Sequence, residues 1–141
     1  MQIEILSDVD NKTITAFNRL MQQLSSNYKP IAKEYLIDII NSSNIIIFVA
    51  KENETIIGSL SLVFYNIPTG MKAWVEDVVI DQSVRGKGVG KALIEQAIVY
   101  AKQSGASKLD LTSSPERVAA NKLYQKLNFE KRETNVYRLM L

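Results

Sequence analysis

Hydrophobic residues recur along this chain with two periods, and the period predicts the local structure. After a short strand at residues 3–5, apolar residues return every three or four positions in two stretches, which predicts two amphipathic helices. The first helix is expected to begin after Asp10, a good N-cap residue, and the second to have Pro30 in its first turn. The positions that define them are Ile14, Phe17, Leu20, Met21 and Leu24, then Ile31, Tyr35, Leu36, Ile39 and Ile40.

The rest of the chain predicts strands and two further helices. Residues 45–51, 55–65 and 72–80 are β-rich runs separated by turn residues, which favours antiparallel neighbours. Residues 88–104 predict a long helix closed by Gly105, and residues 108–112 a strand. Ser114 and Pro115 are expected to begin a helix that runs to Leu127, and residues 136–141 resemble a strand. This order predicts one α/β domain over residues 1–141, with a mixed, mostly antiparallel sheet and helices on both faces.

The composition of the chain excludes several classes of partner and of catalytic site. The net charge of the 141 residues is only +2, which argues against nucleic acid or an anionic membrane as the main partner. The longest apolar run and the N-terminus match neither a membrane helix nor a secretory signal, so a cytoplasmic protein is expected. With no Cys and no His, the chain offers no thiol nucleophile, no Ser-His-Asp triad and no zinc site, and no metal is expected. Acid–base chemistry falls to Asp, Glu, Lys, Tyr or water.

The most informative segment lies between the strand at 72–80 and the long helix. Its residues are Arg85, Gly86, Lys87, Gly88, Val89, Gly90 and Lys91. Glycines let backbone N–H groups approach a ligand, and a helix N-terminus with three cations favours a pyrophosphate. A Walker A loop fails at Arg85 and Ala92, and a dinucleotide fingerprint fails at Lys91. The alternative is a glycine-rich loop that only caps the helix.

Two motifs together resemble those of the GNAT N-acetyltransferase superfamily. Arg85-x-x-Gly88-x-Gly90 after a strand resembles the acyl-CoA pyrophosphate motif, and the later Ala120-x-x-Leu123-Tyr124-x-x-Leu127-Asn128-Phe129 resembles the second signature. The resemblance implies a splayed parallel central strand pair at 75–80 and 108–112. It also implies that acetyl-CoA binds to the turn and to the backbone of Val78, Val79 and Ile80.

The resemblance further implies roles for three groups. The N–H of Val78 stabilises the oxyanion, and Tyr124 is the general acid that protonates the leaving thiolate. Many family members have Asn seven residues before this Tyr, where this chain has Arg117. Asn121, one turn further on, is a candidate for the same cofactor contact, and the choice between the two stays open.

The general base is predicted from the residues themselves. An amine with a pKa of about 10 must lose a proton before it attacks, and no His is present. Glu76 and Asp77 are the two acids in an otherwise apolar strand, and they point to opposite faces unless a bulge intervenes. Both stay candidates at this stage, against the alternative of a salt bridge or a solvated strand edge.

The resemblance implies direct acetyl transfer from acetyl-CoA to a primary amine, either of a small molecule or of a peptide or protein. The absence of Cys agrees with a route that needs no acyl-enzyme. One alternative is a GNAT-like domain that binds acyl-CoA as a sensor or interaction module without turnover. An NTP-binding domain is disfavoured by the failed Walker match. A homodimer paired through the C-terminal strand is a further hypothesis, since exposed edges invite pairing.

Overall fold

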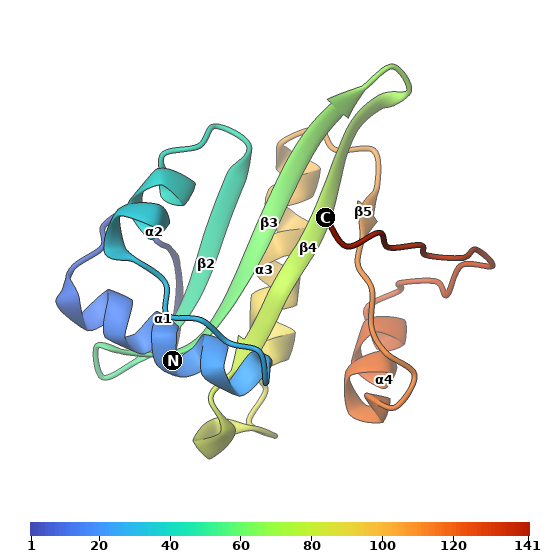
Figure 1. Ribbon diagram of the computed structural model, residues 1–141. Coiled ribbons are helices and arrows are strands. Elements are labelled where there is room, and N and C mark those ends of the chain that lie inside the picture. Colours follow the sequence, from blue (N-terminus) through green and yellow to red (C-terminus); the bar gives the residue numbers. More distant parts are fainter. The chain divides into compact units, whose positions relative to one another are not determined.

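The computed structural model describes residues 1–141, which divide into two compact units, Met1–Leu111 and Thr112–Leu141. Figure 1 shows the helices and strands of both units, coloured along the sequence. The first unit contains β1 (Gln2–Ile5), α1 (Asn11–Leu24), α2 (Lys33–Ile40), β2 (Ile45–Glu52), β3 (Thr55–Ile67), β4 (Gly70–Ile80), the 3-10 turn η1 (Gln82–Val84), α3 (Val89–Gln103) and β5 (Leu109–Asp110). The second unit contains α4 (Val118–Lys126).

The strands form one mixed sheet in the order β1-β2-β3-β4-β5, which confirms the predicted α/β class. The pairs from β1 to β4 are antiparallel, and β4 pairs with β5 in parallel. The β2–β3 turn lies at Asn53 and Glu54, between the two strands as expected, and both residues have positive φ, as the tight turns of β-hairpins often do. The parallel pair lies at the end of the sheet rather than in its centre, and β5 has only two of the five residues expected for it.

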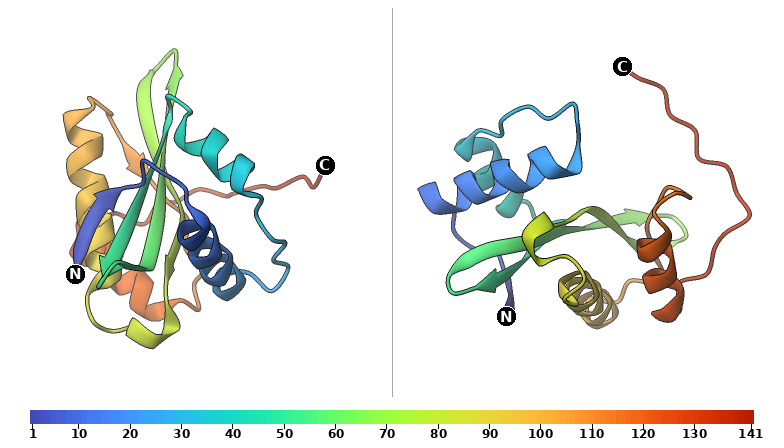
Figure 2. Two further views of the ribbon diagram at one scale, coloured as in Figure 1. Left: turned by 90° about the vertical axis from the view of Figure 1, so that its left-hand side faces the viewer. Right: turned by 90° about the horizontal axis from the view of Figure 1, so that it is seen from below.

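Helices cover both faces of the sheet, as Figure 2 shows. Val49 and Val79 belong to a core cluster with Phe17 and Leu20 of α1 and Leu36 of α2. Phe48, whose side chain points to the opposite face from Val49, packs its ring against Tyr100 of α3 at 5.6 Å. The sheet therefore separates an α1/α2 side from an α3 side.

The predicted start is confirmed for α1 and wrong for α2. Asp10 caps α1 as predicted, and its Oδ1 accepts a hydrogen bond from the N–H of Thr13 at 2.8 Å. The prediction that Pro30 lies in the first turn of α2 is wrong, because Ala32 is the N-cap. The chain before it is held instead by Asn18, whose side chain bonds the N–H of Ile31 at 2.7 Å.

The second unit corrects two predictions. Ser114 does not cap α4; it begins a turn in which the N–H of Arg117 donates to its carbonyl, and Arg117 is the N-cap. The strand expected at residues 136–141 does not form, because no neighbouring strand supplies the hydrogen bonds that a strand requires. Asn128, two residues after α4, has a φ of 71°, the left-handed conformation that commonly ends a helix.

No helix of the chain combines the length and the apolar character that crossing a membrane requires.

Candidate functional site

A β-bulge in β4 sets the geometry of the predicted site. Ser61 of β3 pairs with Glu76 and Ser59 pairs with Val79, so two residues of β4 face one residue of β3. The first of these two residues, Asp77, has a φ of 50°, which is unusual for a residue with a side chain. The two predicted acids therefore do not follow simple strand alternation.

The bulge also changes which backbone N–H groups point to the free side of β4. Ala73 donates to Lys108 at 3.0 Å on the β5 side, whereas Asp81 donates to Ile57 at 2.8 Å on the β3 side. Counting back from Asp81 by strand alternation directs the N–H groups of Ile80 and Val78 away from β3. The parallel ladder covers only Ala73 and Trp74, so the rest of β4 has no β5 partner. This is the splayed geometry that the resemblance implies.

Glu76 lies on the α1/α2 side of the sheet. It pairs with Ser61, which in turn pairs with Ile47 of the α1/α2 core cluster, and paired residues share a face. Glu76 and Asp77 are both exposed, and neither takes part in any of the three ion pairs of the chain. The salt-bridge alternative for these acids is therefore not what the structure contains.

Trp74 shares the face of Glu76 because it lies two residues earlier in the same strand. Its indole N–H is buried and has no hydrogen-bond partner. Leaving a buried donor unpaired costs about 1–3 kcal/mol of folding free energy. The α1/α2 side of β4 therefore carries both an unpaired indole N–H and a carboxylate without an ion pair.

The glycine-rich turn leads from β4 into α3 with an open backbone. Gly86 and Gly88 have φ values of 80° and 82°, and a Cβ added at either would meet no atom within 4 Å. Glycine is needed there for its backbone conformation, and the space beside it is free for a ligand. Val79 and Val89 have buried side chains, so only their backbone groups are available for binding.

The N-terminus of α3 has free hydrogen-bond donors and cationic neighbours. Gly88 is its N-cap, no side chain caps it, and its first turn has no acidic residue. Three cations surround it: Arg85 donates weakly to the carbonyl of Ile80 at 3.4 Å, Lys91 lies 3.9 Å from Glu95, and Lys87 is exposed. Orphan N–H groups, the helix dipole and these charges together favour a phosphate group.

Asp81, between β4 and this turn, is a buried acid that the sequence analysis missed. Its Oδ1 accepts from the N–H and the hydroxyl of Ser83 at 3.0 and 2.8 Å, which caps η1. Its Oδ2 accepts from Arg19 Nε at 3.0 Å. The Ser83 hydrogen bonds, aided by Arg19, lower the pKa of Asp81. No local signal identified it, because Arg19 is 62 positions away.

The lowered pKa predicts how acid affects the fold. Because Asp81 has a lower pKa folded than unfolded, its contribution to the free energy of unfolding is present above about pH 4, the unfolded pKa. It is lost as the pH falls through the folded pKa. Urea unfolding at pH 7 and pH 3 should show a larger loss in the parent chain than in Asp81→Asn. Equal losses would contradict this assignment.

The second unit carries the remaining predicted residues. Tyr124 is 7% exposed, and its ring meets Phe129 edge-on at 5.9 Å. Burial raises the pKa of Tyr124, although Arg117 opposes this shift. The side-chain amide of Asn121 donates to the carbonyls of Ser114 and Arg117 at 2.9 and 2.8 Å. Its nitrogen is thus committed to the start of α4, and its oxygen is left for a ligand.

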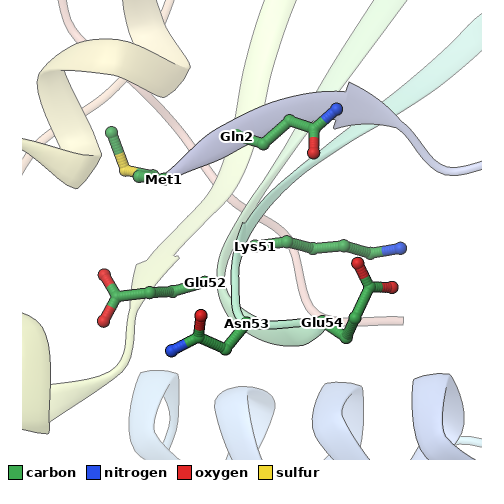
Figure 3. Close-up of a pocket in the computed structure, with 6 residues that line it drawn as sticks. All are labelled: Met1, Gln2, Lys51, Glu52, Asn53 and Glu54. Carbon is green, nitrogen blue, oxygen red and sulfur yellow. The ribbon is translucent and has the colours of Figure 1, made fainter.

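A polar pocket lies elsewhere in the first unit and contains none of the predicted site residues. It is lined by Met1, Gln2, Lys51, Glu52, Asn53 and Glu54, at the β2–β3 turn and the edge strand β1 (Figure 3). Lys51 is held there by an ion pair with Glu4 at 2.6 Å. No group of three or more Asp or Glu side chains in the chain is arranged to hold a metal ion.

Comparison with solved structures finds the same architecture in acetyltransferases. A putative acetyltransferase from Agrobacterium tumefaciens str. C58 aligns with a TM-score of 0.87 at 19% identity, over 99% of this chain and 100% of that one. An acetyltransferase of Trypanosoma brucei aligns with a TM-score of 0.79 at 27% identity, over 99% of both chains. The first of these likenesses concerns the fold alone.

Sequence comparison gives the family. A glucosamine 6-phosphate N-acetyltransferase of Trypanosoma brucei brucei is 36% identical over 62% of this chain and 59% of that protein. An uncharacterised N-acetyltransferase of Methanocaldococcus jannaschii is 37% identical over 48% of this chain and 30% of that protein. This chain thus matches less than two-thirds of the length of either relative. The family described as acetyltransferase (GNAT) matches residues 14–129, which include both the glycine-rich turn and α4. The chain belongs to the acetyltransferase (GNAT) family.

Proposed function

We propose that this chain transfers the acetyl group of acetyl-CoA directly to a primary amine. The observation that carries the proposal is the β4 bulge, which turns the Val78 and Ile80 N–H groups to the free side of the strand just before the glycine-rich turn. Free strand N–H groups followed by an open helix N-terminus fit an extended ligand that ends in phosphates. Acetyl-CoA has this form, and it supplies an activated acetyl group as a thioester.

Residues of the first unit bind acetyl-CoA, stabilise the oxyanion and accept the proton of the amine. Backbone N–H groups from Arg85 to Lys91 hold the pyrophosphate, and Val78 and Ile80 hold the pantetheine arm. The N–H of Val78 stabilises the negative charge that develops on the carbonyl oxygen, for which one aimed donor contributes about 3–4 kcal/mol. Glu76, free of ion pairs on the α1/α2 side, accepts the proton of the amine.

Tyr124 is proposed as the general acid. A phenol with an ordinary pKa of about 10 already holds its proton at neutral pH, and burial raises the pKa of Tyr124 further, so the hydroxyl is protonated when the thiolate forms. Asn121, through its free side-chain oxygen, is the proposed cofactor contact in place of the usual Asn. The relative named for glucosamine 6-phosphate supports an amine acceptor for this chain, either a small amine or a peptide amine.

The test is release of free thiol from acetyl-CoA across amino sugars, aminoglycosides, polyamines and peptide N-termini. The parent chain is expected to turn over with one acceptor class. Tyr124→Phe, which keeps the ring but removes the proton, should lower kcat about tenfold or more. Tyr137→Phe, at a tyrosine that is 88% exposed in the tail, is the matched control and should leave kcat unchanged.

Other outcomes would change the proposal. Binding of acetyl-CoA without turnover on any amine would favour a sensor or interaction module that does not catalyse transfer. No binding at all would contradict the assignment of the glycine-rich turn. Equal kcat in Tyr124→Phe and the parent would remove Tyr124 from the chemistry.

A further inference from the structure

The turn that precedes α3 is fastened by two side chains from a distant part of the sequence. Arg19 and Gln23 lie one turn apart on α1 and therefore point to the same side of that helix. Arg19 Nε donates to Asp81 Oδ2 at 3.0 Å, and Gln23 Oε1 accepts from the N–H of Gln82 at 2.9 Å. Successive residues of the turn are thus held by successive turns of α1.

Arg19 also ties this turn to the sheet. Its Nη2 donates to the carbonyl of Ile56 in β3 at 2.7 Å, while Asp81 donates its own N–H to Ile57 of the same strand at 2.8 Å. The planar guanidinium can bridge a carboxylate and a carbonyl at once, which an ammonium group does less well. Asp81 is 9% exposed, whereas the side chain of Arg19 is 41% exposed, so the connection is buried at the carboxylate and open to solvent at the guanidinium.

The glycine-rich turn has few other attachments. Arg85, Gly86, Lys87 and Gly88 are all exposed, and the helix that follows has no side-chain cap. Upstream, the N–H of Val84 donates to the carbonyl of Asp81 at 3.0 Å, and Val84 is buried. The position of Asp81 therefore determines where the backbone of the turn begins.

We propose that Arg19 and Gln23 are positioning residues that hold the Asp81–Gln82 turn, so that the glycine-rich segment is preorganised for the pyrophosphate of CoA. They connect α1, which packs on the sheet face that carries Glu76, to the cofactor side of the site. The proposal rests on the proposed function, because the ligand of the turn is taken from it. Neither residue touches the ligand; both act through Asp81 and Gln82.

The test measures CoA affinity by titration calorimetry in Arg19→Met and Gln23→Met, with thermal melting recorded for each. Misplacing a binding loop is costly, so each variant is expected to raise Kd for CoA about fivefold or more. At saturating acetyl-CoA the kcat should stay within about twofold of the parent, because the chemistry is untouched. Arg19→Lys, which keeps the charge but not the planar fork, should fall between Arg19→Met and the parent.

Two matched controls lie on the exposed side of the same helix. Lys12→Met removes a positive charge from α1, and Gln22→Met removes an amide, at residues that are exposed and bond neither Asp81 nor Gln82. Both controls should keep the parent affinity for CoA. Parent affinity in Arg19→Met and Gln23→Met, whatever their melting temperatures, would overturn the proposal. If Arg19→Met does not fold, the Kd for CoA of Gln23→Met alone decides between the two outcomes.

Hydrogen exchange separates this proposal from the proposed function. Without ligand, the amides of residues 82–91 should exchange about fivefold or more faster in Arg19→Met than in Lys12→Met, because the turn opens more often. If the parent does not bind CoA, the proposed function fails, and faster exchange would still support the positioning role. Equal exchange in that case would overturn it.

Discussion

Replacing Glu76 by Gln is expected to lower kcat about a hundredfold or more while leaving the Kd for CoA unchanged, since general base catalysis contributes about 10²–10⁴. Gln keeps the size of the side chain but cannot accept the proton of the amine. Glu76 lies exposed on the α1/α2 side of the sheet and takes part in no ion pair, so the substitution breaks no salt bridge. Steady-state kinetics with the acceptor found in the panel would measure the effect.

The pH profile adds a readout that a structural defect would not give. Activity of Glu76→Gln should recover as the pH rises towards the pKa of a free amine, about 10, because the acceptor then loses its proton without help. Asp77→Asn is the matched control: the neighbouring acid is also exposed, but it occupies the bulge. A large loss in Asp77→Asn together with a small loss in Glu76→Gln would transfer the role of base to Asp77.

Replacing Phe48 by Ala is expected to lower the free energy of unfolding by about 3–5 kcal/mol, the usual effect of removing a buried aromatic ring. Phe48 is 1% exposed in the middle of β2 and meets Tyr100 of α3 edge-on. The substitution leaves a cavity between the sheet and α3. Since small domains have only about 5–15 kcal/mol of stability, much of the total would be lost.

Urea unfolding of Phe48→Ala and of Ile67→Ala tests this expectation. Ile67 is also a large apolar residue of the sheet, but it is 44% exposed at the β3–β4 turn. Its truncation should change the free energy of unfolding by only about 0.5 kcal/mol, as surface substitutions usually do. A similar small effect for Phe48→Ala would mean that α3 does not pack on the sheet as described.

Local sequence signals predicted the elements whose hydrogen bonds close within a few residues. The periodicity of α1 and the cap at Asp10 are examples, since both depend on neighbours in the chain. The β2–β3 turn follows the same rule. The predicted helix starts at Pro30 and Ser114 were wrong. Before α2 the chain is held by Asn18, a residue of another helix, and α2 begins after Ala32. Before α4, Ser114 begins a turn and does not cap the helix.

The sequence by itself determined the α/β class, the glycine-rich turn and its charges, and the choice of acids available for catalysis. Only the tertiary structure decided that a bulge separates Glu76 from Val79, because a bulge is a property of two paired strands and not of one. It also decided the partners of Asp81, since Arg19 reaches that carboxylate only after α1 packs on the sheet. The missing C-terminal strand has the same cause: strand-forming residues become a strand only where another strand accepts their hydrogen bonds.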